Sequence, residues 1–231
     1  LEYADLSSLA SVREFGARFL EREDRLDVLI NNAGVLFSDR EQSADGIELS
    51  FATNVLGPFL LTSLLIPLLE ASAPSRIINV SSGGMYTQKL DVEDLQFERK
   101  PFNGVTVYAQ AKRAQVILTE LWAEKLAGSG VIVNAMHPGW ADTPGVRTSI
   151  PRFHRLSRKG LRTPEQGADT IIWLAVAESV AGTSGRFWLD RRERATHLLP
   201  GTQSSARDRQ QLWDECVRLC ERRASNEQTN L

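Results

Sequence analysis

The sequence predicts an α/β fold with a doubly wound parallel sheet. Short apolar strands alternate along the chain with helices of ten or more residues, the pattern of βαβ units. The strands also end in polar or glycine-rich residues, namely "NNAG" from residue 31, "VSSGG" from residue 80 and "MHPGW" from residue 136. In open parallel sheets, ligands bind beyond the carboxyl ends of the strands. These three segments are therefore the first candidates for a binding site.

The first predicted element is a helix over residues 7–23, because apolar residues recur there every three or four positions and Asp5 or Ser7 can cap its start. The elements that follow are a strand at 27–30, a helix at 45–71, a strand at 76–82, a helix at 105–127, a strand at 131–139, a helix after Pro164, a strand at 185–190 and a C-terminal helix within 205–223. We expect parallel strands whose faces are both covered by helices.

Length and composition favour one globular domain over residues 1–231. The net charge of −2 gives no global indication of nucleic-acid binding. The longest apolar run, residues 54–71, is interrupted by glycine, proline and polar residues, so a buried helix explains it better than a membrane span. Cys216 and Cys220 are too few for a disulfide framework, which suggests a reducing compartment or indifference to redox conditions.

The segment "VYAQAKRAQ" places Tyr108 and Lys112 four positions apart on a predicted helix, and therefore on one face. Taken alone, such a pair is more often two solvated side chains than a catalytic unit. Ser82 before two glycines is, taken alone, more often a turn residue. Gly34 after "NNA" is equally open, because a glycine lets the backbone approach a flat ligand but also suits an ordinary turn.

The order of these motifs along the chain favours the functional interpretation of each motif over the purely structural one. "NNAG", Asn54, Ser82, the Tyr108–Lys112 pair and Pro138-Gly139 follow one another at successive strand ends and helices. This order resembles the short-chain dehydrogenase/reductase family over nearly the whole chain. The stretches "VSSGGMYTQKLDVEDLQFER", "MHPGWADTPGV" and "LWDECVRL" resemble its branch with retinol-dehydrogenase-like members. The resemblance implies a Rossmann-like oxidoreductase that transfers a hydride between NAD or NADP and an alcohol or carbonyl substrate. We expect that substrate to be apolar, such as a retinoid, steroid or lipid aldehyde.

The resemblance also implies catalytic roles. Tyr108 would be the general acid in carbonyl reduction and the base in alcohol oxidation. A free phenol has a pKa of about 10, and a neighbouring ammonium lowers it. Lys112 would supply that charge and hold the nicotinamide ribose. Ser82 would orient the substrate oxygen, and Asn54 would hold a water that links Lys112 to solvent.

The remaining implied contacts are with the cofactor. Asn32, Ala33 and Gly34 would line its path, Pro138 and Gly139 would shape the nicotinamide pocket, Thr143 would bond the carboxamide and Asp5 would lie near the adenine. No metal is needed, because the cofactor carries the hydride. A small-molecule substrate is the expected partner, and the pattern predicts neither the preferred nicotinamide nor the oligomeric state.

One family motif is not found in the 231 residues. The glycine-rich turn "TGxxxGxG" belongs before Asp5, together with the first two strands, which lie at the centre of the family's sheet. Without them we expect weak dinucleotide binding and an open sheet edge. Two explanations remain open. The chain is a fragment of a longer enzyme, or it is a natural short, non-catalytic form that acts by binding a partner.

Residues 144–163 carry six Lys and Arg and no Asp or Glu. In the family this region covers the substrate, which predicts a lid that accepts anionic or membrane-surface substrates. A solvated loop and helix is the simpler interpretation. We expect a location in the cytoplasm or on a membrane facing the cytosol. His137 beside the Pro-Gly turn is expected to be structural, and His154 and His197 receive no role.

Overall fold

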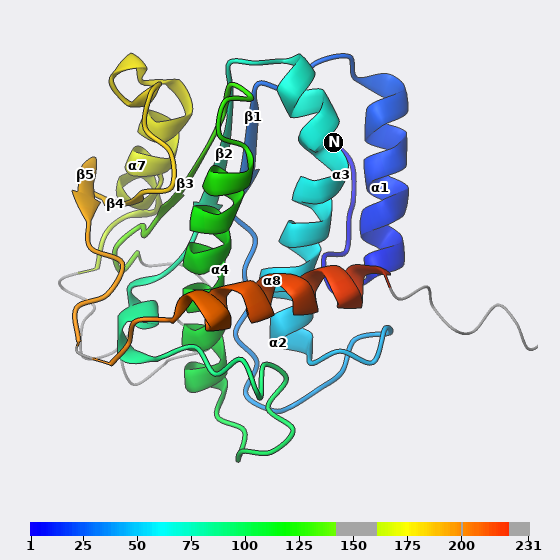
Figure 1. Ribbon diagram of the computed structural model, residues 1–231, viewed down its shortest axis with the longest axis vertical. Helices are drawn as coiled ribbons and strands as arrows, with labels where there is room; N and C mark the ends of the chain where they lie inside the picture. Colours follow the sequence, from blue (N-terminus) through cyan, green and yellow to red (C-terminus); the bar gives the residue numbers. More distant parts are fainter. Residues whose placement is uncertain (142–160, 200, 222–231) are drawn as a thin grey trace, which may run out of the picture.

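The computed structural model describes residues 1–141, 161–199 and 201–221, whose strands form one sheet in the order β1-β2-β3-β4-β5 (Figure 1). The strands are β1 (Val28–Asn31), β2 (Ser75–Val80), β3 (Val131–Met136), β4 (Phe187–Leu189) and β5 (Arg192–Arg194). The first four are parallel, and β5 runs antiparallel to β4. The carboxyl ends of β1, β2 and β3 therefore meet at one edge, as the sequence predicts.

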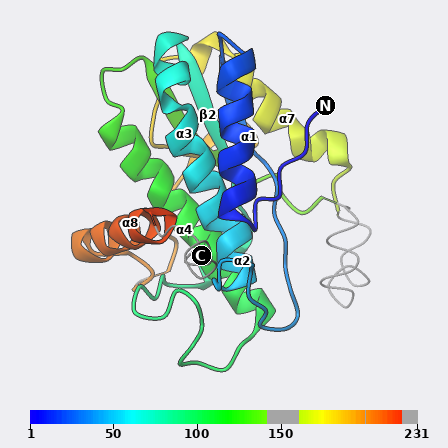
Figure 2. The same ribbon diagram turned by 90° about the vertical axis from the view of Figure 1, so that its right-hand side faces the viewer.

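Helices cover the two faces of this sheet unequally (Figure 2). α1 (Leu9–Arg22), α3 (Gly57–Ala71) and α4 (Gly104–Lys125) lie on one side, and α7 (Pro164–Val176) lies on the other. Successive strand residues alternate between the two cores, so Ile77 packs with the α3–α4 side and Ile78 with α7. The sheet is thus buried on both faces around β2 and β3, where the candidate site begins.

Within the described residues β1 pairs only with β2, so the sheet has the open edge that the sequence predicts. Ile30 of this edge strand is 41% exposed. The outer edge of such a strand presents N–H and C=O groups that have no partner strand.

The predicted helix at 45–71 begins later and is not uniform. It starts as α2 (Leu49–Phe51), widens into a π turn at Ala52–Leu56 and continues as α3. Glu48 sets the start, because its carboxylate accepts from the backbone N–H groups of Ser50 and Phe51 at 2.8 and 2.7 Å. The prediction placed the start at residue 45, inside a turn that precedes this cap.

The Leu49–Ala71 run is long and apolar enough to cross a membrane by length and composition, but 67% of its most apolar window is buried inside the protein. It packs between α1 and the sheet (Figure 2). The buried-helix interpretation explains its hydropathy.

α8 (Ala206–Glu221) crosses α4 on the outside of the molecule (Figure 1). Its residues Leu212, Cys216 and Leu219 are fully buried. The Trp213 ring of α8 packs edge-on against Trp122 of α4, with 4.6 Å between the ring centroids. Cys216 and Cys220 are both buried free thiols. The C-terminal helix is thus part of the core that supports α4.

Two strand predictions needed correction. The strands predicted at 76–82 and 131–139 end at Val80 and Met136, because the chain turns into a short 3-10 helix after Ser82 and into the Pro138 turn. β5 was not predicted at all. Its hairpin turn uses Asp190 and Arg191 at φ of 54° and 56°, without the glycine that normally marks such turns.

Candidate active site

Tyr108 and Lys112 lie one turn apart on α4, which Asn103 caps through a 3.0 Å bond from the Thr106 N–H. The Lys112 amine donates 2.9 Å to the carbonyl of Val80, the last residue of β2. The same nitrogen lies 5.5 Å from the centre of the Tyr108 ring. The helix therefore delivers both side chains to the carboxyl end of the sheet.

Ser82 reaches Tyr108 from the end of β2. It is the N-cap of the 3-10 helix Gly83–Thr87, where its Oγ accepts from the Gly84 N–H at 3.2 Å. The Ser82 hydroxyl lies close enough to the Tyr108 phenol to lower its pKa. Two neighbouring hydroxyls can both point at one substrate oxygen.

The pKa values of Tyr108 and Lys112 differ from those expected from the sequence. Burial lowers the pKa of Lys112 to about 7, so the amine is only partly charged near neutral pH. Burial also raises the pKa of Tyr108, and the neighbouring Ser82 hydroxyl offsets this only in part. The expected lowering of the Tyr108 pKa is therefore not found in this structure, and burial is the largest cause of its rise. An effect of the Lys112 charge on this pKa stays a prediction.

Gly34 makes room for two of these groups. A Cβ on Gly34 would lie 3.1 Å from the Lys112 Nζ and 3.2 Å from the Asn54 Oδ1, closer than most side-chain contacts. Asn32, Ala33 and Gly34 are exposed at the end of β1. The missing side chain therefore lets the backbone of this exposed turn pack close to the lysine amine and to Asn54.

Asn54 is hydrogen-bonded to the turn after β1. Its Oδ1 accepts from the Val35 N–H at 3.0 Å, and its Nδ2 donates to the carbonyls of Val35 and Ser50, both at 2.9 Å. The side chain is thus fully used in holding the backbone. Whether Asn54 also holds a relay water stays a prediction.

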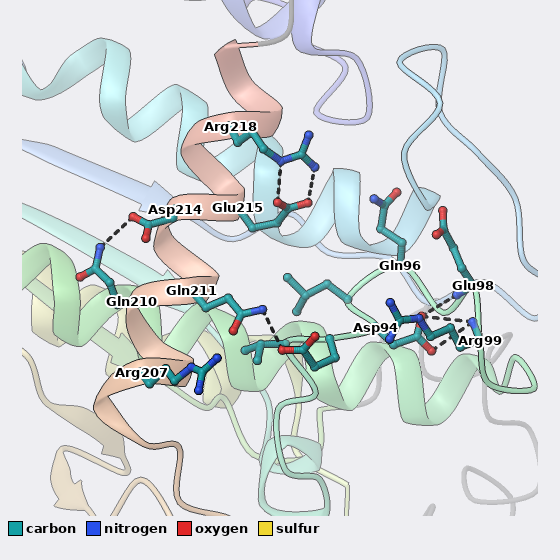
Figure 3. Close-up of a pocket in the computed structure, with 13 residues that line it drawn as sticks. Asp94, Gln96, Glu98, Arg99, Arg207, Gln210, Gln211, Asp214, Glu215 and Arg218 are labelled. Carbon is teal, nitrogen blue, oxygen red and sulfur yellow. Dashed lines mark hydrogen bonds and ion pairs between the residues drawn. The ribbon is translucent and has the colours of Figure 1, made fainter.

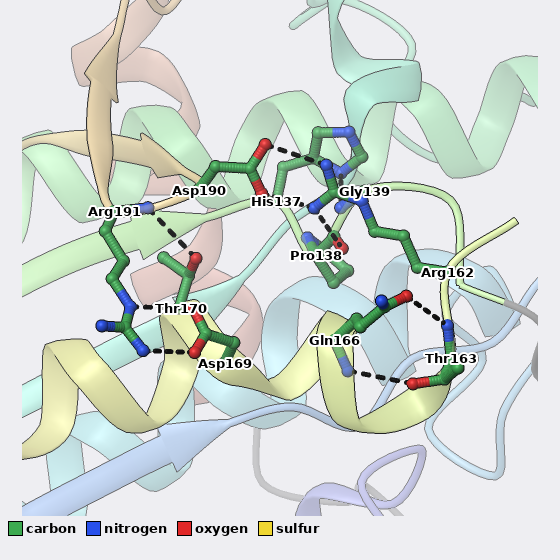
Figure 4. A network of polar contacts seen from close by, with 10 residues as sticks. All are labelled: His137, Pro138, Gly139, Arg162, Thr163, Gln166, Asp169, Thr170, Asp190 and Arg191. Carbon is green, nitrogen blue, oxygen red and sulfur yellow. Dashed lines mark hydrogen bonds and ion pairs between the residues drawn. The ribbon is translucent and has the colours of Figure 1, made fainter. Parts of the chain in front are cut away.

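Pro138 and Gly139 follow β3 and are held by a polar network (Figure 4). Gly139 has φ of 77°, and its N–H donates 3.3 Å to the His137 Nδ1. Arg162 donates to both carboxylate oxygens of Asp190 at 2.5 and 2.8 Å and to the Pro138 carbonyl. Through these hydrogen bonds Arg162 connects the Pro-Gly turn to the β4–β5 hairpin.

His137 is structural, as expected, and sequence reasoning missed how it works. Burial and the nearby Arg162 lower its pKa to about 4, so the ring stays neutral. Its Nε2 lies 2.7 Å from where a Cβ on Gly83 would be. Gly83, the residue after Ser82, must therefore be a glycine for the imidazole to fit.

Asp5, predicted to lie near the adenine, takes part in a local turn. Asp5 accepts from the Ser7 N–H and hydroxyl at 2.9 and 2.7 Å, which uses its Oδ1 to cap the turn before α1. Thr143 and most of the predicted lid at 144–163 lie outside the described residues. No cluster of three or more His, Cys, Asp or Glu side chains that could hold a metal occurs in the described part of the chain.

A large groove lies elsewhere in the described part of the chain. A groove of about 620 Å³ lies between the loop at 92–99 and α8, and it is lined mainly by charged side chains such as Arg99, Arg207 and Glu215 (Figure 3). Glu215 is paired with Arg218 across the edge of this groove. None of the predicted site residues lines it. The chemical groups of the candidate site therefore lie outside this groove.

These groups gather at the carboxyl edge of a parallel sheet, where open α/β folds bind their ligands. The model of the short chain dehydrogenase family matches residues 3–152, and the chain belongs to this family.

The relatives agree with this assignment and with the retinol-dehydrogenase-like branch. The chain is 49% identical over 207 residues to human dehydrogenase/reductase SDR family member 12, covering 89% of this chain and 64% of that protein. It is 41% identical over 229 residues to human retinol dehydrogenase 13, covering 94% and 67%. The chain therefore spans about two thirds of the length of these relatives.

Solved structures show the same fold. A protein from Mycobacterium paratuberculosis aligns with a TM-score of 0.74 at 25% identity, over 96% of this chain and 76% of that one. The Pseudomonas aeruginosa RhlG/NADP active-site complex aligns with a TM-score of 0.62 at 27% identity, over 80% and 72%.

Proposed function

We propose that the protein is an NAD(P)-dependent oxidoreductase that interconverts an apolar alcohol and its carbonyl compound. The observation that carries this proposal is the close approach of Gly34 to Lys112 and Asn54. A Cβ at Gly34 would crowd the Lys112 Nζ and the Asn54 Oδ1, and Tyr108 and the neighbouring Ser82 lie beside the same lysine. Such convergence of a proton donor, an orienting hydroxyl and an open backbone suits hydride transfer.

The chain's own residues would work as follows. The bound nicotinamide supplies or accepts the hydride. Ser82 donates to the substrate oxygen and orients it, and Tyr108 gives its proton to that oxygen as negative charge develops there. Because burial raises the pKa of Tyr108, the phenol stays protonated and is suited to act as the acid in carbonyl reduction. Lys112 would hold the nicotinamide ribose.

The proposal extends to the substrate class and the location of the protein. The 41% identity to a retinol dehydrogenase supports an apolar substrate such as a retinoid, steroid or lipid aldehyde. The buried free thiols Cys216 and Cys220 support a cytosol-facing location, either in the cytoplasm or on a membrane.

Replacement of Tyr108 by phenylalanine tests the proposal. Wild-type protein should oxidise NADPH or NADH in the presence of an apolar aldehyde, followed by absorbance. Tyr108→Phe should lower kcat by about 10²–10⁴-fold, the usual worth of a positioned acid, while the affinity for the dinucleotide measured by calorimetry stays unchanged. Equal turnover by the two proteins would refute the assignment of Tyr108.

A second function is a non-catalytic role in binding a partner. The observation that favours it is the sequence itself, in which the 231 residues include no "TGxxxGxG" turn to hold a pyrophosphate. Calorimetry of the chain with NADP and NAD separates the two functions. Dinucleotide binding supports the oxidoreductase, and its complete lack supports the binding role.

A further inference from the structure

Gln115 lies on α4 three residues after Lys112, and sequence reasoning gave it no role. Its side chain is buried, and its Nε2 donates a 2.7 Å hydrogen bond to the backbone carbonyl of Asn54. In a regular helix this carbonyl would accept from the N–H four residues later. That residue is Pro58, which has no N–H. Gln115 therefore serves a carbonyl whose regular helical donor is missing.

The π turn around Asn54 belongs to the same arrangement. The turn spans Ala52–Leu56 and directly precedes Gly57 and Pro58 at the start of α3. Single π turns interrupt the regular bonding of a helix and are frequent at functional sites. An amide from α4 that bonds to this turn holds the interruption in one place against the neighbouring helix.

The contact continues from Asn54 to Lys112. The Asn54 side chain holds Val35 by both its N–H and its C=O. Val35 follows Gly34, whose empty Cβ position lies 3.1 Å from the Lys112 Nζ. Gln115 thus fixes Asn54, Asn54 fixes the turn at 33–35, and this turn covers the amine of Lys112.

The other end of the Gln115 amide has no partner. Its Oε1 is buried without a hydrogen bond in the described part of the chain, as is the Ser50 Oγ. The amide cannot simply be reversed, because its nitrogen must face the Asn54 carbonyl. A buried acceptor without a donor destabilises the fold. Packing alone therefore does not explain a glutamine at position 115. The stabilising contact of its side chain is the hydrogen bond that the Nε2 donates to the Asn54 carbonyl.

We propose that Gln115 is a positioning residue for Lys112, which by donating to the Asn54 carbonyl holds the 33–35 turn over the lysine amine and keeps it out of water. Its consequence for catalysis rests on the proposed function. The positioning itself is a property of this chain and can be measured without a cofactor. The titratable group that faces the amine in the described residues is Tyr108 of the same helix.

The test is the pKa of Lys112, measured by NMR on protein with labelled lysine and assigned through the loss of its signal in Lys112→Arg. Gln115→Met keeps the length of the side chain and removes the donor. We expect it to raise the Lys112 pKa from about 7 by about one unit, because water then reaches the amine. The melting temperature should change by less than about 3 °C, because the unpartnered Oε1 is removed as well.

Gln110→Met is the matched control. Gln110 is buried on the same helix and bonds to the Asp91 N–H, away from Asn54. An unchanged Lys112 pKa in Gln115→Met, or an equal shift in both variants, would overturn the proposal. If Gln115→Met does not fold, Gln115→Asn, whose amide is too short to reach the carbonyl, takes its place in the comparison. A chain that binds no dinucleotide would defeat the proposed oxidoreductase while leaving this measurement intact.

Discussion

At the scale of single residues, the site depends on a buried lysine. Lys112 is 2% exposed, and its amine has a described hydrogen bond to a backbone carbonyl rather than to a carboxylate. Desolvation of this kind disfavours the charged form of an amine. Burial lowers the pKa of Lys112 to about 7. Because this pKa differs between the folded and unfolded chain, the protonation of Lys112 is coupled to the stability of the fold.

Lys112 should therefore make stability rise with pH. The folded chain releases this proton near pH 7, whereas the unfolded chain keeps it up to about pH 10.5. Between these values the unfolded state binds more protons, so the free energy of unfolding should increase by at most about 1.4 kcal/mol per pH unit from this group. Below pH 7 both states are protonated, and the buried charge destabilises the fold in full.

Lys112→Met removes this dependence. Urea unfolding at several values between pH 7 and pH 9 should show a flatter pH dependence for Lys112→Met than for wild type, and a more stable variant at pH 6.5. Lys89→Met, at an exposed position, is the control and should keep the wild-type slope. A Lys112→Met variant with an unchanged slope would contradict the burial of the neutral amine.

At the scale of elements, α4 is the central support of the site. It carries Tyr108, Lys112 and Gln115, and it is held from outside by α8 through aromatic and aliphatic packing. α8 itself carries no site residue. Its buried stripe nevertheless sets how firmly α4 rests against the sheet.

Truncation of the α8 stripe should destabilise the protein. Leu212 is 0% exposed, so Leu212→Ala leaves a cavity between α8 and α4 and should lower the free energy of unfolding by about 2–5 kcal/mol. Asp214→Ala, on the exposed side of the same helix, should change it by less than about 0.5 kcal/mol. Denaturant titration measures both. Equal effects would mean that α8 does not pack on α4 as described.

At the scale of the whole molecule, the outer edge of β1 is a candidate site of association between copies of the 231-residue chain. Within the described residues β1 pairs with β2 alone, and Ile30 on it is 41% exposed. Edge strands with exposed apolar side chains are templates for association between chains, and lysine on an edge prevents it.

Ile30→Lys should reduce association of the chain. Light scattering or sedimentation across a range of concentrations should show less self-association for Ile30→Lys than for wild type, while the free energy of unfolding changes by less than about 1 kcal/mol. Leu198→Lys, at an exposed apolar position away from β1, is the control and should associate like wild type. If Leu198→Lys has the same effect as Ile30→Lys, added charge rather than the strand edge is responsible.

The sequence by itself determined the fold class and the order of most elements, and it predicted the members of the candidate site. Period-two and period-3.6 patterns mark strands and helices, and the order of "NNAG", Asn54, Ser82, Tyr108 and Lys112 indicates the family. Both signals are local in the chain, so they survive without knowledge of tertiary contacts. The same locality explains the missed β5, whose turn lacks a glycine.

Only the tertiary structure decided the electrostatics and the supports of the site. The pKa of Lys112 depends on how much water reaches its amine, and this depends on a turn almost eighty residues away in sequence. The bond from Gln115 to Asn54 likewise joins two helices distant in the chain, although the proline four residues after Asn54 was a readable signal. Desolvation and long-range hydrogen bonds arise from packing, and no local pattern encodes them.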